Sequence, residues 1–423
     1  MVLVFTCCGC GDSKQDSLDS IAEEYVKLVL EIGQYDGDFV DAYYGPEEWK
    51  PAAGDPLDSI PPGELTNRVV QLIDNLDNLD REGLSDLEGA RLRMLGKQCT
   101  AVLTKLKMLR GETYSFDQEA MLLYDTKAPS NDTMHFNKLL AILNDMLPGK
   151  ESLPEKYREF SAQFIIPPDK LDQVFQTAIM EARERCKKNL YLPANENFRL
   201  EYVTDKSWSG YNYYQGNSQS LIQINTDLPI YIERAIDLAC HEGYPGHHVF
   251  NALIEKNLVQ DKNWLEFSIY PLFSPQSLIA EGSANYGIEM AFPGKQKVAF
   301  EKEVLYPLAG IDTSLANLYD SIQQIRAALN YAGNEAARAY LDGNISREEA
   351  ASMLEKYLLY EPERALQRTH FIDQYRSYVI NYNWGKDLVA DYVENAIKHT
   401  KSDRWIIFED LLSTPHTASS LSN

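Results

Sequence analysis

The spacing of hydrophobic residues along the chain predicts helices over most of its length. Four long segments place apolar side chains at intervals close to 3.6 residues, which gathers them on one helix face. These segments begin at Ser17, Ser85, Asp169 and Ser346. In the second and the fourth, a glutamate follows the serine three residues later, which is the capping box that starts a helix. We therefore expect a mostly α-helical protein.

One segment, Ser220 to Asn225, alternates polar and apolar residues in the way that a β-strand does. The turn-rich sequence SWSGYNYYQGNSQ precedes it. After it, Asp227 can cap a helix and Pro229 can begin one. We expect this strand to lie at the edge of a small sheet, where its free backbone groups can pair with an extended peptide.

The predicted helix after that strand ends in the sequence HEGYPGHH, from His241 to His248. On a straight helix, two histidines four residues apart converge on one metal ion. Here the later histidines come six and seven residues after the first. The earlier of these two would be rotated by about 120°, and the later one would lie about 10 Å along the axis. A regular helix therefore does not bring them together.

The helix, however, contains two residues that break it. Pro245 has no N–H to donate to the carbonyl of His241, and Gly246 accepts almost any backbone angle. Either the histidines are a chance cluster, or a two-residue bulge at Pro245–Gly246 brings His247 to His241. We expect the second, with Glu242 beside the metal as general base. His248 is the alternative to His247 as ligand.

A third ligand is expected on the following helix, which begins near Leu278 and carries Glu281. Catalytic zinc is held by three protein ligands, and in gluzincins the third is a glutamate on a later helix. His241, His247 and Glu281 are thus the predicted ligands of Zn²⁺. Glu289, two turns later, is the alternative to Glu281 as third ligand. Asn285, one turn after Glu281, is placed to orient a ligand histidine.

At these residues the chain resembles a bacterial family called domain of unknown function 885, which is grouped with the zincin-like metallopeptidases. Its H-E-x-x-P-G-H-H hallmark is matched at every fixed position from His241 to His248. Its second hallmark, E-G-W-A-x-Y, is matched by Glu281, Gly282, Ala284 and Tyr286, with Ser283 in place of the aromatic residue. Looser likeness extends over about residues 20–400.

The resemblance implies a two-lobed helical zincin with a deep cleft that admits oligopeptides. It also implies a hydrogen-bond donor from a late helix, because negative charge develops on the substrate carbonyl oxygen. Tyr382 is our candidate for this donor, ahead of Tyr378, Arg376 and His370. We divide the chain into an N-terminal lobe at 17–195 and a catalytic lobe at 196–423.

Residues 1–16 resemble the end of a bacterial lipoprotein signal, with an apolar run followed by Cys10 directly after Gly9. This resemblance implies a protein of the bacterial cell envelope that is anchored through lipid on Cys10. The alternative is an N-terminal segment without a role. Acidic residues outnumber basic ones by 63 to 40, a net charge of −23. Such a chain has no basic surface for nucleic acid and is repelled by anionic membranes.

The predicted function is a zinc-dependent hydrolase, best interpreted as a metallopeptidase that cleaves oligopeptides. One alternative is a non-catalytic envelope protein that keeps the zincin fold for binding. Retention of Glu242 disfavours that alternative, because zinc binding alone needs no general base. The other alternative is a zinc hydrolase of a non-peptide amide, which uses the same metal chemistry.

Overall fold

The computed structural model describes residues 10–52, 63–206 and 208–422. Its first half contains seven helices among the described residues: α1 (Cys10–Ile32), α2 (Glu64–Asp77), α3 (Asp86–Leu109), α4 (Phe116–Tyr124), α5 (Thr133–Met146), α6 (Leu153–Ser161) and α7 (Leu171–Lys187). The capping box at Ser85 is present, because its hydroxyl accepts from the N–H of Glu88 and the glutamate side chain accepts in return. Helix α1 begins at Cys10, ahead of the expected start at Ser17.

The second half is also mostly helical. Its helices are α8 (Glu233–Leu238), α9 (His247–Ile254), α10 (Pro275–Ala291), α11 (Gln296–Phe300), α12 (Tyr306–Ala309), α13 (Ala316–Leu329), α14 (Tyr331–Leu341), α15 (Arg347–Leu358), α16 (Pro362–Tyr375), α17 (Ile380–Thr400), α18 (Arg404–Ser413) and α19 (Ala418–Leu421). The capping box at Ser346 starts α15 as expected. The predicted mostly α fold with small sheets is confirmed. The division of the chain at residue 195 stays a prediction.

The strands form two small sheets. Strand β1 (Val40–Tyr43) pairs with β5 (Ile269–Pro271), and the other sheet has the order β2 (Asn197–Val203), β4 (Gln219–Asn225) and β3 (Gly210–Tyr214). The expectation that Ser220 to Asn225 forms an edge strand is wrong, because β4 is bonded on both sides. Strand β3 is an edge strand of this sheet, and it lies in the segment SWSGYNYYQGNSQ, whose composition predicted only turns. Strand β3 runs antiparallel to β4.

The helix after this sheet also begins later than expected. Residues 230–232 pair with residues 164–166: the N–H of Ile166 donates to Ile230, and the N–H of Ile232 donates to Phe164, both at 2.9 Å. These backbone groups are therefore occupied by a neighbouring segment, and α8 starts only at Glu233 rather than at Pro229. Asp227 instead accepts from the N–H of Asp205.

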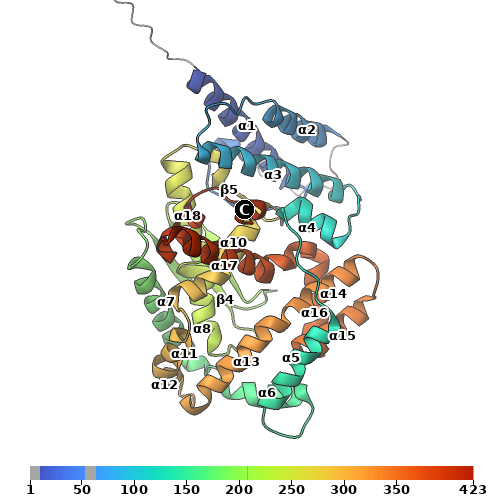
Figure 1. Cartoon of the computed structure of the whole chain (residues 1–423), viewed down its shortest axis with the longest axis vertical. Helices are drawn as coiled ribbons and strands as arrows, with labels where there is room; N and C mark the ends of the chain where they lie inside the picture. Colours follow the sequence, from blue (N-terminus) through green and yellow to red (C-terminus); the bar gives the residue numbers. More distant parts are fainter. Residues whose placement is uncertain (1–9, 53–62, 207, 423) are drawn as a thin grey trace, which may run out of the picture.

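Helices α10 and α17 pack against each other near the middle of the long axis, between α1–α3 at one end and α5, α6 and α12 at the other (Figure 1). The two backbones approach closely where Gly282 of α10 meets Gly385 of α17, since a β-carbon on Gly282 would overlap the carbonyl oxygen of Gly385. This contact sets the distance between the two helices that carry Glu281 and Tyr382.

The N-terminal prediction falls mostly outside this description. Residues 1–9 lie outside the described residues, and Cys10 is the first residue of α1. Within the described ranges, none of the helices is long and apolar enough to cross a membrane.

The α10–α17 contact predicts that Gly282→Ala destabilises the protein. Overlap with the Gly385 backbone should lower the free energy of unfolding by about 1–3 kcal/mol, more than the gain in helix propensity of about 1 kcal/mol. The measurement is urea unfolding of the metal-free protein. Gly96→Ala is the matched control, because Gly96 also lies within a helix but nothing within 4 Å meets its added β-carbon. Equal or raised stability in both variants would contradict this close contact.

Candidate metal centre

The helix that carries His241 widens before it ends. After α8, residues Ala239–Gly243 form a π-helical turn, and the N–H of Tyr244 donates to the carbonyl of Ala239 at 2.9 Å. Tyr244 is extended and its peptide bond to Pro245 is cis. The distortion therefore begins upstream of the predicted bulge at Pro245–Gly246 and continues through it. Helix α9 then starts at His247.

Gly246 lies where the chain crosses over the end of this widened turn. Its N–H donates to the carbonyl of Cys240 at 2.8 Å. A β-carbon at this position would overlap the carbonyl oxygens of both Cys240 and His241. The turn therefore requires glycine because of a close backbone approach. It brings the ring of His247 to 4.7 Å from the ring of His241, at an angle of 89°.

The predicted ligands lie together in the structure. The nearest ligating atoms of His241, Glu242 and His247 are all within 4.8 Å of one another. Glu281, in the second turn of α10, reaches the same place: its Oε2 is 3.4 Å from Nε2 of His241, and its Oε1 is 3.7 Å from Nε2 of His247. Two imidazoles and two carboxylates thus converge from three elements.

One oxygen of Glu281 lacks a partner that burial would normally require. Its Oε1 accepts a hydrogen bond from the hydroxyl of Tyr378 at 2.8 Å. Its Oε2 is buried and accepts no hydrogen bond from any described residue. A buried carboxylate oxygen without a donor is unfavourable unless a cation or metal ion compensates it. The residues present therefore fit a metal ion.

Asn285 fixes the orientation of the His241 ring. Its Oδ1 lies 3.2 Å from Nδ1 of His241, and its Nδ2 donates to the carbonyls of Glu281 and Tyr382. Because Oδ1 can only accept, Nδ1 carries a proton, and Nε2 is the ring nitrogen on the side of Glu281. This is the position predicted for Asn285.

Burial and charge set the protonation of the cluster. Burial lowers the pKa of His247 to about 4, so its imidazole is neutral and available as a ligand near pH 7. Burial also raises the pKa of Glu242 to about 7, with the charge of Glu281 adding to the rise and His241 opposing it. For Glu281 burial acts upward, but its interactions with the imidazoles of His241 and His247 leave its pKa below the usual range.

His248 lies in a different environment from His247. Its ring is fully buried, with Nδ1 at 2.8 Å from the hydroxyl of Ser220 on β4 and Nε2 at 3.2 Å from Glu196. Glu196 also accepts from Tyr244 and Arg183. His248 thus fastens the start of α9 to the three-stranded sheet and directs its nitrogens away from the cluster.

The other sequence candidates have partners elsewhere. Glu289 pairs with Lys386 at 2.6 Å, and Arg376 donates to Glu119 at 2.7 Å. His370 is exposed and lies 2.8 Å from Arg347. Tyr382 lies against Tyr378, with 5.6 Å between ring centroids, and its hydroxyl makes no hydrogen bond with the described residues. Burial and then the charge of Glu281 raise its pKa.

Several neighbours of the cluster gave no sequence signal. Asn212 on β3 donates to the carbonyl of Glu242 at 2.6 Å. Tyr211 donates to Asp41 of β1. Burial raises the pKa of Asp41 to about 6, and the charge of Glu281 adds to the rise. These residues come from segments far apart in the chain, and neither segment carries a motif that pointed here.

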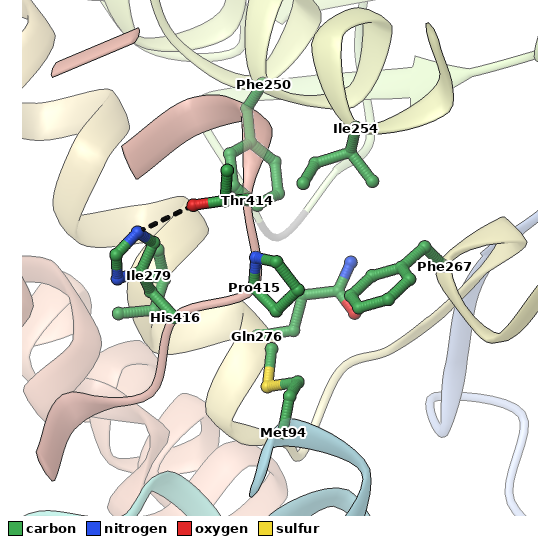
Figure 2. Close-up of a pocket in the computed structure, with 9 residues that line it drawn as sticks. All are labelled: Met94, Phe250, Ile254, Phe267, Gln276, Ile279, Thr414, Pro415 and His416. Carbon is green, nitrogen blue, oxygen red and sulfur yellow. Dashed lines mark hydrogen bonds between the residues drawn. The ribbon is translucent and has the colours of Figure 1, made fainter. Parts of the chain in front are cut away.

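A separate apolar pocket lies away from this chemistry. Residues of α3, α9 and α10 line it with Phe267 and residues 414–416, and Thr414 lies 2.9 Å from Nε2 of His416 (Figure 2). It shares no residue with the cluster. Its lining offers no group of metal ligands.

Comparison with known proteins shows similarity at the level of fold. No family model and no curated protein matches the chain in sequence. A candidate lipoprotein from Colwellia psychrerythraea has a TM-score of 0.53 and 14% identity, over 85% of this chain and 65% of that one. The chain thus spans less than two thirds of that protein's length. At this identity the similarity shows the fold alone.

Two further solved structures give lower scores. A candidate lipoprotein of unknown function from Shewanella oneidensis has a TM-score of 0.48 and 15% identity, over 86% of this chain and 73% of that one. Metallocarboxypeptidase 1 of Trypanosoma cruzi has a TM-score of 0.43 and 11% identity, over 95% and 88%.

The crossing at Gly246 predicts that Gly246→Ala weakens metal binding. The added methyl group must push the chain away from the carbonyl of His241 and displace His247. We expect divalent-metal affinity to fall by about 10–100-fold, as it does when groups that orient ligands are lost. A chromophoric chelator in competition with the protein measures this. Gly333→Ala, whose added carbon meets only an ordinary contact at 3.6 Å, is the control and should bind as wild type. Unchanged affinity in Gly246→Ala would disprove the role of the crossing.

Proposed function

We propose that this protein is a zinc-dependent hydrolase that cleaves peptide bonds in oligopeptides. His241, His247 and Glu281 would hold the zinc, and Glu242 would act as general base. The observation that carries the proposal is the buried Oε2 of Glu281, which faces Nε2 of His241 at 3.4 Å and has no hydrogen-bond donor among the described residues.

The donor set favours zinc over other metals. Two imidazoles and one carboxylate form a set that catalytic zinc uses, with a fourth position left for water. When bound, zinc polarises the substrate carbonyl and lowers the pKa of its water. Magnesium and calcium prefer oxygen ligands alone, which this cluster does not provide.

Glu242 is placed to move the proton in hydrolysis. Its side chain is 6% exposed, and its Oε1 lies 4.0 Å from Nε2 of His241. The carbonyl of the same residue is held by Asn212, which fixes the backbone from which the carboxylate projects. Oε1 would accept the proton of the attacking water and later donate it to the leaving amine.

A tyrosine would stabilise the negative charge that develops on the substrate carbonyl oxygen. The hydroxyl of Tyr378 is committed to Glu281 at 2.8 Å. The hydroxyl of Tyr382 has no hydrogen-bond partner among the described residues, while its carbonyl is fixed by Asn285. Tyr382 is therefore the proposed donor, and Tyr378 is proposed to position Glu281.

The peptide would bind along β3. This strand is bonded to β4 on one side, and no described strand pairs with its other side. Gly210 lies beside Glu242, since a β-carbon there would be 3.0 Å from Oε1 of Glu242. A peptide that extends the sheet at β3 would place its backbone beside the general base. A larger residue at position 210 would occupy this space.

The proposed location is the bacterial cell envelope, with a lipid anchor on Cys10. The sequence before Cys10 supports it, as does the fold shared with the candidate lipoprotein of Colwellia psychrerythraea.

Glu242→Gln tests the function directly. We expect zinc content and unfolding midpoint to stay at wild-type values while peptide cleavage slows by about 10²–10⁴-fold, the usual effect of losing a general base. Zinc is measured by atomic absorption, and cleavage by mass spectrometry of a mixed peptide library. Glu289→Gln is the control, because Glu289 pairs with Lys386 outside the cluster. Wild-type cleavage by Glu242→Gln would exclude this mechanism. Zinc-loaded wild type that cleaves no peptide would favour a binding protein or a hydrolase of another amide.

The two adjacent histidines predict opposite phenotypes. His247→Ala should lose stoichiometric zinc with little change in the stability of the metal-free protein. His248→Ala should retain zinc but lower the free energy of unfolding by about 1–3 kcal/mol, because Ser220 and Glu196 lose a buried partner. Chelator competition and urea unfolding measure the two effects. Zinc lost from His248→Ala and kept by His247→Ala would reverse the assignment of the ligand.

A further inference from the structure

Four arginines from three helices act with their charges on one tyrosine, Tyr360: Arg234 of α8, Arg326 of α13, and Arg364 and Arg368 of α16. We call this group the arginine cluster. The guanidinium of Arg364 lies 4.4 Å from the ring centre of Tyr360, and that of Arg326 lies 4.6 Å from the ring centre of Tyr157. The ion pair between Arg158 and Glu361, at 3.5 Å, holds the segments of these two tyrosines together.

Helix α8 joins this group through the same segment of chain. The end of α6 leads to residues 164–166, which pair with residues 230–232 at the start of α8. Arg234 comes next, in the first turn of that helix, and donates to Ser209 at 3.3 Å. Backbone hydrogen bonds thus link the start of α8 with the segment that follows α6. Helix α6 in turn carries Tyr157, which contacts Arg326, and Arg158, which pairs with Glu361.

These arginines lack the acidic partners that the composition would supply. The chain has 63 acidic and 40 basic residues, yet Arg326, Arg364 and Arg368 form no ion pair with any described residue, and their ring contacts are with aromatic residues. Only Arg234 has a carboxylate nearby, Asp237 at 3.6 Å. By contrast, the buried Arg91 is paired with two carboxylates. Three of the four arginines thus form no ion pair among the described residues, although Glu233 and Arg326 both act on Tyr157.

The effect of this charge is visible at Tyr360. Burial acts to raise the pKa of its hydroxyl, but the charges of Arg364, Arg368, Arg326 and Arg234 outweigh burial and lower it. The surroundings of Tyr360 therefore favour a negative charge.

A row of aromatic rings connects the cluster with the metal centre. The guanidinium of Arg368 lies 4.0 Å from the ring of Phe371, which lies 4.6 Å from that of Tyr375. Tyr375 is 6.1 Å from Tyr378, whose hydroxyl bonds Glu281. Ring contacts along α16 therefore link Arg368 with the tyrosine that bonds the proposed ligand Glu281.

We propose that the arginine cluster binds a carboxylate of the peptide substrate, with Arg368 as its principal contact. The carboxylate is either the free C-terminus or the side chain of Asp or Glu. Guanidinium groups form paired hydrogen bonds with carboxylates, which gives both affinity and orientation. The proposal rests on the proposed function and adds its substrate class: peptides that carry a negative charge near the bond to be cleaved.

The test measures binding, so that it does not depend on turnover. Zinc-loaded Glu242→Gln is titrated with three labelled peptides followed by fluorescence anisotropy. They share one uncharged sequence and differ at the end: a free carboxylate, an amide, and an amide after a final glutamate. We expect at least one carboxylate peptide to bind about 10–100-fold more tightly than the neutral amide, as for hydrogen bonds to charged groups. Adding Arg368→Gln should remove this preference, and Arg368→Lys should restore part of it.

Controls separate the proposal from a general loss of structure or charge. Arg93→Gln removes one positive charge from the exposed side of α3 and should keep the preference. Arg364→Gln removes an exposed member of the cluster and should weaken the preference without unfolding the protein. Preference for the free terminus identifies the α-carboxylate, and preference for the final glutamate identifies a side chain.

Equal binding of the three peptides, or a preference unchanged in both Arg368→Gln and Arg364→Gln, would overturn the proposal. If the preference is present but wild-type protein cleaves none of the peptides, the binding site stands and the hydrolase function fails.

Discussion

Glu281 carries its charge among buried side chains, with one carboxylate oxygen bonded to Tyr378 and the other facing His241 without a donor. Burial of a carboxylate is tolerated when its charge is compensated, and a metal ion held with the two imidazoles that lie within 3.7 Å would compensate it. Much of the surrounding architecture serves this arrangement. Helix α10 supplies the carboxylate, α17 approaches it through the contact of Gly282 with Gly385, and the broken helix supplies both histidines.

The helix that follows the break is fixed to the three-stranded sheet through His248. His247 and His248 begin the same helix but contact different groups, one beside Glu281 and the other between Ser220 and Glu196. A fixed second histidine limits the rotation of the first, because both belong to one helical turn. The network around Glu196 therefore contributes to the metal centre without touching it. The same reasoning applies to Asn285, which fixes His241 and the backbone at Tyr382 together.

Sequence reasoning succeeded where the signal was local. Capping boxes at Ser85 and Ser346 start helices as expected, and the helix-breaking residues in HEGYPGHH led to a bend that the structure contains. It failed where distant segments decide the outcome. The backbone pairing of Ile230 and Ile232 with residues 164–166 delays α8, and the partner strand β3 turns an expected edge strand into a central one. The positions of Asp41 and of the arginine cluster depend on tertiary packing, so no local sequence pattern predicts them.

Because His247 and His248 point in opposite directions, the number of residues in the turn before them matters. Each residue added to a helix rotates all later side chains by about 100° around its axis. One residue inserted between Glu242 and His247, with α9 kept in place, would put the first imidazole where His248 now faces the sheet and the second past Glu281. Substitutions can be tolerated at many positions of the chain, but the segment between Glu242 and His247 must keep its length. The number of residues from His241 to His248 therefore matters to the candidate centre as much as the identity of its side chains.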